Sequence, residues 1–339
     1  MNESRTTSLA RSGVSTKTSA HDIGELAGGG RQPGSSPHLL EKGVEGIQQE
    51  GVAKILLAIA RTGQIISKQL SFRVGMTKSV NPFGERQAEL DVFSNDAFSK
   101  ALLETNVVAS VASEELETPL TNPALSNDSA YSVAMDPIDG SSNITTNNPL
   151  GSIFGIWRGH LPQSGRKLVA SAFITYGPTL SFTFTRNDSV DQYVELREGQ
   201  NAGRFVLAYS SLRLPEKPEV YGFGGTRSDW IPQVEKFVAS LEARGMHLRY
   251  GGTFIGDYNQ ILQRGGIFSY PAHRSKPHGK LRIMYETAPI SFLTELAGGS
   301  SSDGTRSILD IEPSSLSQRS PFYVGNKGLI EELEAQLSA

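Results

Sequence analysis

The chain lacks several features that would point to particular classes of protein. It contains no cysteine, which excludes disulfides, thiolate metal ligands, a cysteine nucleophile and thiol-based redox control. No apolar run approaches the roughly 20 residues of a membrane span, and no signal-peptide core follows Met1. There is no long basic run and the formal net charge is -3, so neither nucleic acid nor a membrane surface is an expected partner. We therefore expect a soluble, cytoplasmic protein.

Residues 1–40 differ in composition from the rest of the chain. They are rich in Ser, Thr, Gly, Arg and Pro, a composition that buries too little apolar surface to offset the entropy of ordering. We expect a disordered tail. Two other origins stay open, an organellar targeting peptide and a cloning remnant, although Glu3, Asp22 and Glu25 are untypical of a transit peptide.

The order of elements after the tail predicts a layered α/β protein, an α+β sandwich. Helical spacing of apolar residues predicts one long helix over residues 45–70 and a second that includes residues 90–101. Short β-branched and aromatic runs then predict strands at 106–112, 133–135, 151–157, 168–176 and 180–185. Because helices come first and strands follow, layers of helix on sheet are favoured over a strictly alternating βα unit.

A Pro- and Glu-rich interruption, PEKPE, follows Leu214 and predicts a domain boundary there. The expected domains are an α+β domain over residues 41–214 and an α/β domain over residues 215–339. In the second domain the patterns predict helices at 229–243, 256–263, 290–297 and from 327, and strands at 266–270 and 280–285, the last ending in Glu286.

The stretch YSVAMDPIDGSSN, residues 131–143, combines two features that phosphate chemistry needs. Asp136 and Asp139 lie three residues apart across a proline turn, after an apolar run, so both carboxylates can face one point. Gly140, Ser141 and Ser142 then offer backbone N–H groups and hydroxyls that can cradle a phosphate. Asp-Pro and Asp-Gly also form ordinary surface turns, so the other acidic residues must decide between the two interpretations.

Further carboxylates follow two other predicted strands. Glu114 and Glu115 are adjacent, and adjacent glutamates repel unless a cation lies between them or one is protonated; Glu286 ends the strand at 280–285. Glu85 lies just before the second predicted helix, and Asp91 lies inside it. A lone acidic residue at either place is most often a solvated surface charge. Since ligands bind beyond strand ends in such sheets, these groups can share one pocket.

A shared pocket of this kind predicts a metal-dependent phosphatase. All the candidate ligands are oxygen donors, which favours Mg²⁺, with Mn²⁺ as a substitute, over Zn²⁺. Two or more ions beside a Gly-Ser-Ser phosphate cradle favour metal-assisted phosphoryl transfer to water. The sequence contains neither a GxxxxGK[ST] loop nor kinase motifs, so a nucleotide-dependent kinase or ATPase is not expected.

The motifs VASEE, DPIDGSSN, GKLRIMYETAP and AGGSSSDG, in this order, resemble the class I fructose-1,6-bisphosphatase family over about residues 45–330. The resemblance implies a sugar-phosphatase fold with two mixed-sheet domains flanked by helices. It also implies metal ligands, namely Glu114, Asp136, Asp139, Glu286 and the carbonyl of Ile138. Asp91 and Glu115 are implied to orient and deprotonate the attacking water, and Gly140, Ser141 and Ser142 to hold the departing phosphate. Glu85 stands where the family has an aspartate, with an implied role in the catalytic metal site.

The same resemblance implies a substrate site in the second domain. Arg249, Tyr250, Tyr270, Lys280 and Arg282 match the family's sugar and distal-phosphate positions. Where fructose bisphosphatases carry Asn-Glu-Gly-Tyr, this chain has Gly224-Gly225-Thr226-Arg227, and an arginine after a Gly-rich turn is similar to sedoheptulose-1,7-bisphosphatases. The leading hypothesis is therefore hydrolysis of the 1-phosphate of sedoheptulose 1,7-bisphosphate to sedoheptulose 7-phosphate, with a fructose-1,6-bisphosphatase as the alternative.

Two other readings are less favoured. An inositol phosphatase handles one phosphate and would not call for Arg227, Arg249 and Lys280 together. A non-catalytic sugar-phosphate-binding regulator, a different class of function, fits poorly with an intact set of acidic residues. We also expect a homo-oligomer, a dimer or a tetramer, as the family resemblance implies.

Overall fold

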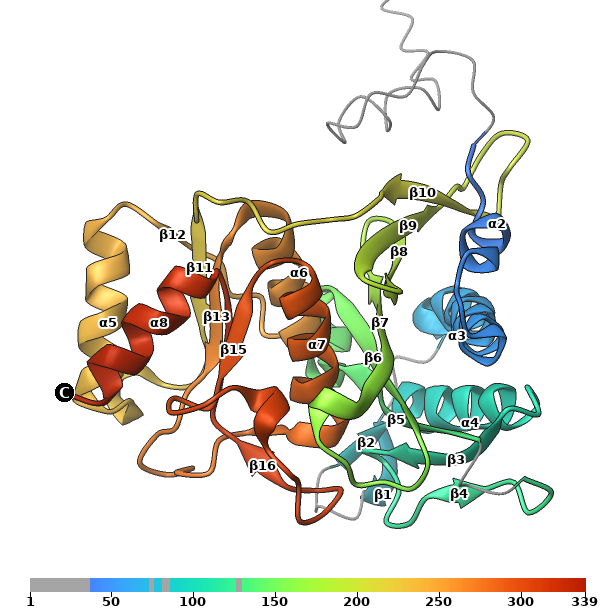
Figure 1. Ribbon diagram of the computed structural model, residues 1–339, viewed down its shortest axis with the longest axis horizontal. Coiled ribbons are helices and arrows are strands. Elements are labelled where there is room, and N and C mark those ends of the chain that lie inside the picture. Colours follow the sequence, from blue (N-terminus) through green and yellow to red (C-terminus); the bar gives the residue numbers. More distant parts are fainter. Residues whose placement is uncertain (1–36, 73–75, 81–85, 126–129) are drawn as a thin grey trace, which may run out of the picture. The chain divides into compact units, whose positions relative to one another are not determined.

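The computed structural model describes residues 37–72, 76–80, 86–125 and 130–339 (Figure 1). Most of the predicted N-terminal tail and Glu85 lie outside the described residues. None of the described helices is long and apolar enough to cross a membrane.

The first described elements are helices that cover one face of a large sheet. Helix α2 (Leu40–Glu45) ends at Gly46, and α3 (Glu50–Gln69) starts after a short link, continuing into the 3₁₀ turn η1 (Leu70–Phe72). The prediction of one helix over 45–70 was thus wrong at its N-terminal end. Helix α4 (Glu89–Leu103) packs against α3 and against the sheet, while β1 (Met76–Val80) and β2 (Arg86–Ala88) form a separate antiparallel pair.

The large sheet has the strand order β10-β9-β8-β7-β6-β5-β3-β4. Its strands are β3 (Val108–Ser113), β4 (Leu120–Thr121), β5 (Tyr131–Asp139), β6 (Leu150–Arg158), β7 (Leu168–Tyr176), β8 (Leu180–Arg186), β9 (Ser189–Glu195) and β10 (Phe205–Tyr209). Among these neighbours only β3 and β5 pair in parallel. The predicted strands are confirmed; β4, β9 and β10 had not been predicted.

Helices cover both faces of this sheet, which is why its central strands are apolar nearly throughout. Phe154 and Ile156 of β6 pack in the core under α3 and α4. Their alternating neighbours Ile153 and Trp157 pack on the opposite face, against α6 (Phe254–Arg264) and α7 (Ala288–Leu296). The period of two along β6 therefore assigns successive side chains to two different cores.

A second sheet lies on the other side of α6 and α7 (Figure 1). Its order is β12-β11-β13-β17-β15, with β11 (Val220–Phe223), β12 (His247–Leu248), β13 (Gly266–Tyr270), β15 (Ser300–Ser302) and β17 (Phe322–Gly325). Its outer face is covered by α5 (Pro232–Ala243) and α8 (Lys327–Leu337), through Val234, Phe237 and Leu333. The result is a five-layer αβαβα sandwich with two mixed sheets flanked by helices, as predicted.

The predicted strand at 280–285 is the largest error in this half. Only Leu281–Arg282 is a strand, β14, which pairs with β16 (Arg319–Ser320). Ile283–Thr287 forms a π-helical turn, η5, that runs directly into α7. The apolar residues of KLRIMY resemble those of a strand in the sequence. In the structure the consecutive residues Ile283, Met284 and Tyr285 are all buried, so their apolar character does not indicate a strand. A π-helical turn is often found at a functional site.

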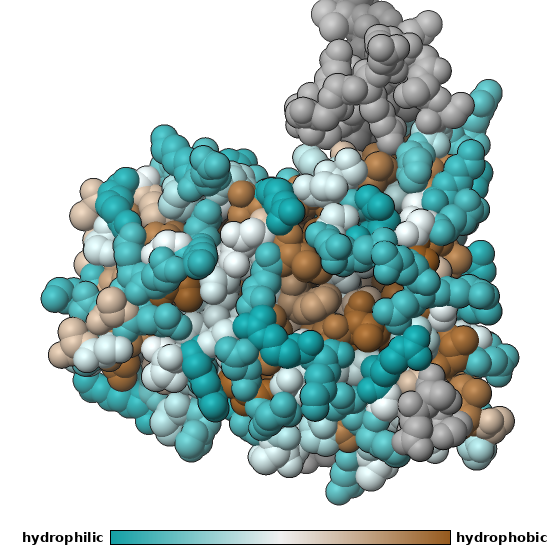
Figure 2. All heavy atoms as spheres, in the orientation of Figure 1, coloured by the Kyte–Doolittle hydropathy of each residue, from teal (hydrophilic) through white to brown (hydrophobic). Residues whose placement is uncertain are grey.

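Residues 37–339 form one packed unit, in which α6 and α7 serve both sheets. The division into domains at residue 214 therefore stays a prediction. On the face shown in Figure 2 hydrophilic residues predominate, with hydrophobic residues visible between them.

Candidate active site

The parallel pairing of β3 and β5 brings two acidic segments to one edge of the large sheet. Ser113 lies opposite Met135 in the register, and the Glu114 N–H donates to the Met135 carbonyl at 3.0 Å. Glu114 and Glu115 thus follow the end of β3 beside the end of β5, which carries Asp136 and Asp139. Since carboxyl ends of parallel strands meet at the same edge, the predicted gathering of these carboxylates has a direct topological cause.

Three carboxylates meet closely enough to hold one cation. Oxygens of Glu114, Asp136 and Glu286 all lie within 4.8 Å of one another. Burial raises the pKa of Asp136 well above its ordinary value, and the negative charges of Glu114, Asp139 and Glu286 raise it further. Like charges this close are stabilised by a cation or by protonation, and an all-oxygen donor set fits Mg²⁺ or Mn²⁺. The residues present therefore fit a divalent metal ion.

Asp139 is held by the start of α6. Its two carboxylate oxygens accept hydrogen bonds from the backbone N–H groups of Phe254 at 3.3 Å and Ile255 at 2.6 Å. A helix N-terminus favours a negative charge, which offsets part of the cost of burial. Burial nevertheless raises the pKa of Asp139 to about 6, while the Ile255 hydrogen bond and the charge of Lys280 oppose the rise.

Glu286 and Arg282 belong to the same cluster. The π-helical turn brings the Glu286 carboxylate back onto the Arg282 backbone N–H, at 2.6 Å. Burial raises the pKa of Glu286 to about 7, opposed by this hydrogen bond and by the Arg282 charge. The buried Arg282 guanidinium contacts the Glu114 carboxylate. Arg282 had been predicted to bind substrate, but the structure places it among the carboxylates, where it neutralises part of their charge.

Of the remaining predicted catalytic residues, Glu115 lies close to this cluster and Asp91 lies on a helix that packs against the same strands. Asp91 is buried in the first turn of α4, which packs against β3 and β5. The charge of Glu115 adds to the raised pKa of Asp136, which places Glu115 close to the cluster. Ile138 lies between the two aspartates, and its N–H donates to Asp136 at 3.0 Å. Glu85 falls outside the described residues.

The predicted phosphate cradle follows β5 directly. Gly140 has a φ of +82°, in the left-handed region, and turns the chain into the 3₁₀ helix η2 (Ser141–Thr146). Ser142 is exposed at the start of this turn, and Ser141 is half-buried. The hydroxyls and N–H groups of the turn therefore begin one residue after Asp139.

Asn143, the last residue of the predicted cradle stretch, joins it to the second half of the chain together with Thr253 and Asp257, which sequence reasoning missed. The Asn143 amide donates to the Gly251 carbonyl at 3.0 Å and contacts the Thr253 hydroxyl. Asp257 accepts hydrogen bonds from the N–H groups of Gly251, at 2.7 Å, and Gly252, at 3.2 Å. The signal in the sequence was an acidic residue next to apolar positions at the start of a predicted helix, shortly after a Gly-Gly pair.

Gly140 gives a test of this junction. A Cβ at Gly140 would lie 2.6 Å from Thr253 Oγ1 and 2.8 Å from its Cγ2, so Gly140→Ala must push the Thr253 loop away from Asn143. We expect kcat/KM to fall about 10- to 100-fold, because misplacement by an ångström can reduce a rate 100-fold. The matched control is Gly199→Ala, at φ +84° with nothing within 4 Å of its Cβ, which carries the backbone strain alone. Equal kinetics for the two variants would contradict the close-approach argument.

A second group of predicted residues gathers near Asp139, close enough for their charges to act on each other. The hydroxyls of Tyr250 and Tyr270 lie 3.2 Å apart, and Lys280 Nζ lies 4.7 Å from the centroid of the Tyr270 ring. The positive charge of Lys280 also lowers the pKa of Asp139 and Glu286, so it stabilises the ionised carboxylates of the metal cluster. Two hydroxyls beside an exposed ammonium group make a site for an anion.

The two other predicted cations are engaged elsewhere. Arg227 is exposed, and its guanidinium pairs with Glu235 at 3.3 Å and Glu242 at 3.6 Å, both on α5. Arg249 precedes Tyr250 and is exposed, with Nη1 donating to the Leu248 carbonyl at 2.9 Å. The structure therefore joins Tyr250, Tyr270 and Lys280 but does not bring Arg227 to them.

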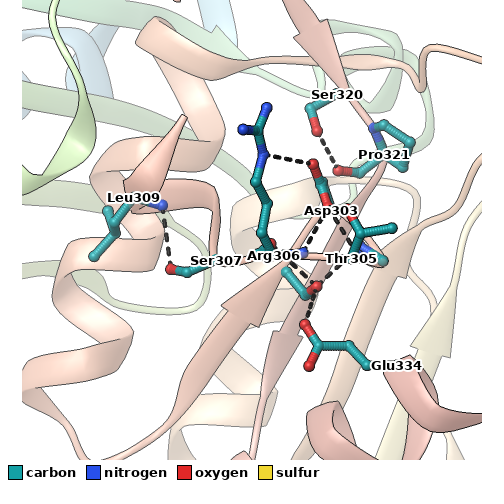
Figure 3. Close-up of polar contacts among 10 residues, drawn as sticks. Asp303, Thr305, Arg306, Ser307, Leu309, Ser320, Pro321 and Glu334 are labelled. Atoms are coloured by element: carbon teal, nitrogen blue, oxygen red, sulfur yellow. Dashed lines mark hydrogen bonds and ion pairs between the residues drawn. The ribbon is translucent and has the colours of Figure 1, made fainter. Parts of the chain in front are cut away.

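The motif GGSSSDG has a structural role in this chain. Asp303 accepts hydrogen bonds from the N–H groups of Thr305 at 2.8 Å and Arg306 at 3.0 Å, which closes the turn after β15 (Figure 3). The hydroxyl of Ser302 donates to Glu334 of α8. The motif thus ties the edge of the second sheet to the terminal helix.

Comparisons with known proteins match nearly all of the described chain. The model of the fructose-1-6-bisphosphatase N-terminal domain matches residues 39–210, and that of the C-terminal domain matches residues 214–338. Class 1 fructose-1,6-bisphosphatases from Haloarcula marismortui and Natronomonas pharaonis are each 39% identical over 289 and 288 residues, covering 85% of this chain and 96% and 99% of theirs. The holo form of Leishmania major fructose-1,6-bisphosphatase superimposes with a TM-score of 0.83 at 28% identity, covering 90% of this chain and 100% of that one.

Proposed function

The chain belongs to the class 1 fructose-1,6-bisphosphatase family, and from this premise we propose that it hydrolyses the 1-phosphate of fructose 1,6-bisphosphate in a metal-dependent reaction. Membership makes it a phosphoric monoester hydrolase that acts on a sugar phosphate. The observation that carries the metal-dependent reaction is the buried cluster of Glu114, Asp136 and Glu286 beside the turn at Gly140.

Each of the site residues has its own role in the proposed reaction. Glu114, Asp136, Asp139 and Glu286 would hold Mg²⁺ or Mn²⁺, together with the Ile138 carbonyl. When bound, such ions polarise the phosphoryl oxygens and lower the pKa of bound water. Asp91 and Glu115 orient the attacking water and accept its proton, as general bases do. The N–H groups and hydroxyls of Gly140, Ser141 and Ser142 bind the oxygens of the phosphate that departs.

Tyr250, Tyr270 and Lys280 hold the phosphate at the other end of the sugar. Their hydroxyls and ammonium group suit a dianion. Arg249, which adjoins Tyr250, contributes further positive charge at this end. Arg282 acts indirectly, because it positions the Glu114 carboxylate.

We propose fructose 1,6-bisphosphate as the substrate in place of sedoheptulose 1,7-bisphosphate, the seven-carbon sugar that was the leading hypothesis from the sequence. The named relatives are fructose-1,6-bisphosphatases, and they match over nearly their whole length. The case for sedoheptulose 1,7-bisphosphate depended on Arg227, whose guanidinium is paired with Glu235 and Glu242. Both lines of support therefore favour the six-carbon alternative.

The experiment that tests this proposal is a comparison of kcat/KM for the two sugars with Mg²⁺ present. We expect fructose 1,6-bisphosphate to be hydrolysed at least about 10-fold more efficiently, a ratio within reach of one mismatched group in a pocket. A preference for sedoheptulose 1,7-bisphosphate would contradict the choice of sugar but leave the phosphatase chemistry standing. Tight binding of either sugar without phosphate release would favour a non-catalytic regulator instead.

Arg227→Tyr tests the residue on which the seven-carbon hypothesis rested. Because the guanidinium is exposed and already paired, we expect the ratio of kcat/KM for the two sugars to change less than about 3-fold, as surface ion pairs contribute little. Both sugars are assayed with the same preparation, so loss of folded protein cancels in the ratio. A 10-fold loss confined to the seven-carbon sugar would return Arg227 to the substrate site. The expected homo-oligomer stays a prediction.

A further inference from the structure

The segment after β13, Pro271–Gly279, is fastened to the turn that follows β11. His273 Nδ1 lies 2.6 Å from a carboxylate oxygen of Asp229, and the Ser275 hydroxyl donates to the same oxygen at 2.6 Å. The Arg274 backbone N–H donates to the Asp229 carbonyl at 3.1 Å. The hydrogen bond from Ser275, with a further contribution from His273, lowers the pKa of Asp229. Contacts from three successive residues thus converge on Asp229.

The two segments joined in this way border the distal-phosphate end of the site. The segment Pro271–Gly279 connects Tyr270, which is held in β13 by its pairing with β17, directly to Lys280, so its path affects where Lys280 lies relative to Tyr270. The turn on the other side begins at Gly224, whose N–H donates to the Ser269 carbonyl at 2.8 Å. Asp229 comes five residues later, in the 3₁₀ turn η4 (Arg227–Asp229).

The glycine turn itself offers no side chain to a phosphate. A Cβ at Gly224 would lie 2.2 Å from the Tyr270 ring, and Gly225 has a φ of +87°, in the left-handed region that favours glycine, so a side chain at either position would be strained. The Trp230 indole also donates to the Gly224 carbonyl at 3.0 Å. Recognition of the distal phosphate therefore falls on the Tyr270 to Lys280 side, and depends on how that side is held.

We propose that Asp229 and His273 form a clasp that positions Tyr270 and Lys280 for the distal phosphate, and so sets the affinity for the bisphosphate substrate. Asp229 and His273 are positioning residues, because they act through Tyr270 and Lys280. This inference rests on the proposed function. It adds a determinant of substrate affinity outside the residues that were matched to the family's substrate site.

Breaking the clasp is expected to separate binding from chemistry. Asp229→Ala and His273→Ala should each raise KM for fructose 1,6-bisphosphate about 10-fold, with kcat within about 2-fold, because neither variant replaces a proposed metal ligand. Hydrolysis of p-nitrophenyl phosphate, which has no distal phosphate, should be unchanged in both variants. His273→Asn keeps an N–H donor at the δ position and should recover most of the affinity. The double variant should be no worse than Asp229→Ala, since Asp229→Ala already removes the contact with His273 that His273→Ala removes.

The matched control is Asp310→Ala, which breaks an exposed carboxylate contact of similar length, 2.7 Å to Arg166, elsewhere on the surface. It should leave both assays unchanged. Unchanged KM in Asp229→Ala and His273→Ala would overturn the clasp. Equal losses on both substrates would overturn it too, since they would show a general structural defect.

A binding measurement keeps the clasp separate from the catalytic proposal. Calorimetry with fructose 6-phosphate reports the distal-phosphate end without turnover, and its Kd should rise about 10-fold in Asp229→Ala. That result supports the clasp even if the wild-type chain proves to hydrolyse no bisphosphate. A wild-type Kd in Asp229→Ala would overturn the clasp while leaving the proposed reaction intact.

Discussion

Asp139→Asn is expected to lower kcat/KM for fructose 1,6-bisphosphate about 1000-fold, roughly 4 kcal/mol of transition-state stabilisation. The change removes one negative charge beside Asp136 and Glu286, which weakens the hold on a divalent cation. An amide also has one acceptor fewer, so it cannot serve the N–H groups of both Phe254 and Ile255. Steady-state kinetics across a Mg²⁺ titration measure the effect, and saturating Mg²⁺ should not restore it.

Asp257→Asn is a matched control because Asp257 is a second buried carboxylate that holds two backbone N–H groups near α6. If Asp139 served only to anchor the start of that helix, the two variants would lose similar activity. We expect Asp257→Asn to lose no more than about 10-fold, the range of an indirect support for a site. Activity of Asp139→Asn within 10-fold of wild type would contradict the proposed mechanism as a whole, provided that its thermal unfolding remains cooperative.

Sequence patterns predicted those helices and strands whose burial leaves a local pattern of apolar residues. The strands around Asp136 were identifiable because helices cover both faces of the large sheet and make its central strands apolar nearly throughout. The acidic edge followed in turn, since Glu114 and Asp136 end strands that pair in parallel. Local pattern and topology agreed there, so prediction and structure agree.

What could not be predicted depends on contacts between distant segments. The π-helical turn at Ile283–Thr287 is set by burial on all sides and by the return of Glu286 onto the Arg282 N–H, neither of which leaves a period in the sequence. Arg227 and Arg282 were assigned to substrate from the family resemblance, an assignment that stays a prediction, and nearby carboxylates engage both guanidinium groups in the structure. The link from Asn143 to Gly251 spans 108 residues and has no local signature.

Removing divalent metal should abolish phosphate release and make stability depend on pH. Burial raises the pKa of Asp139 to about 6 and that of Glu286 to about 7, both above their values in an unfolded chain. The folded metal-free protein therefore binds more protons than the unfolded chain. Stability from these groups is fully present below about pH 4 and is lost as the pH rises through about 6 and then about 7.

The size of this effect is within reach of thermal unfolding. Glu286 alone corresponds to about 3 kcal/mol at most, at about 1.4 kcal/mol per pKa unit, which for a protein of this size is a fall in Tm of about 5 °C between pH 5 and pH 8. Excess Mg²⁺ should remove the fall, because a cation that binds the ionised cluster stabilises the folded state. The comparison needs a chelated and a Mg²⁺-loaded sample at each pH.

Asp136→Asn separates the metal cluster from other sources of pH dependence. It removes one charge from a group of carboxylates whose mutual repulsion raises the pKa of Asp136, so the metal-free variant should unfold at a higher temperature than wild type at pH 8. Its Tm should also respond less to Mg²⁺, and its activity should be lost. A variant that is both inactive and more stable without metal is the outcome that a purely structural role for Asp136 cannot produce. A lower metal-free Tm at pH 8 would instead mean that Arg282 and the backbone already balance the cluster's charge, and the cation would no longer be needed to explain it.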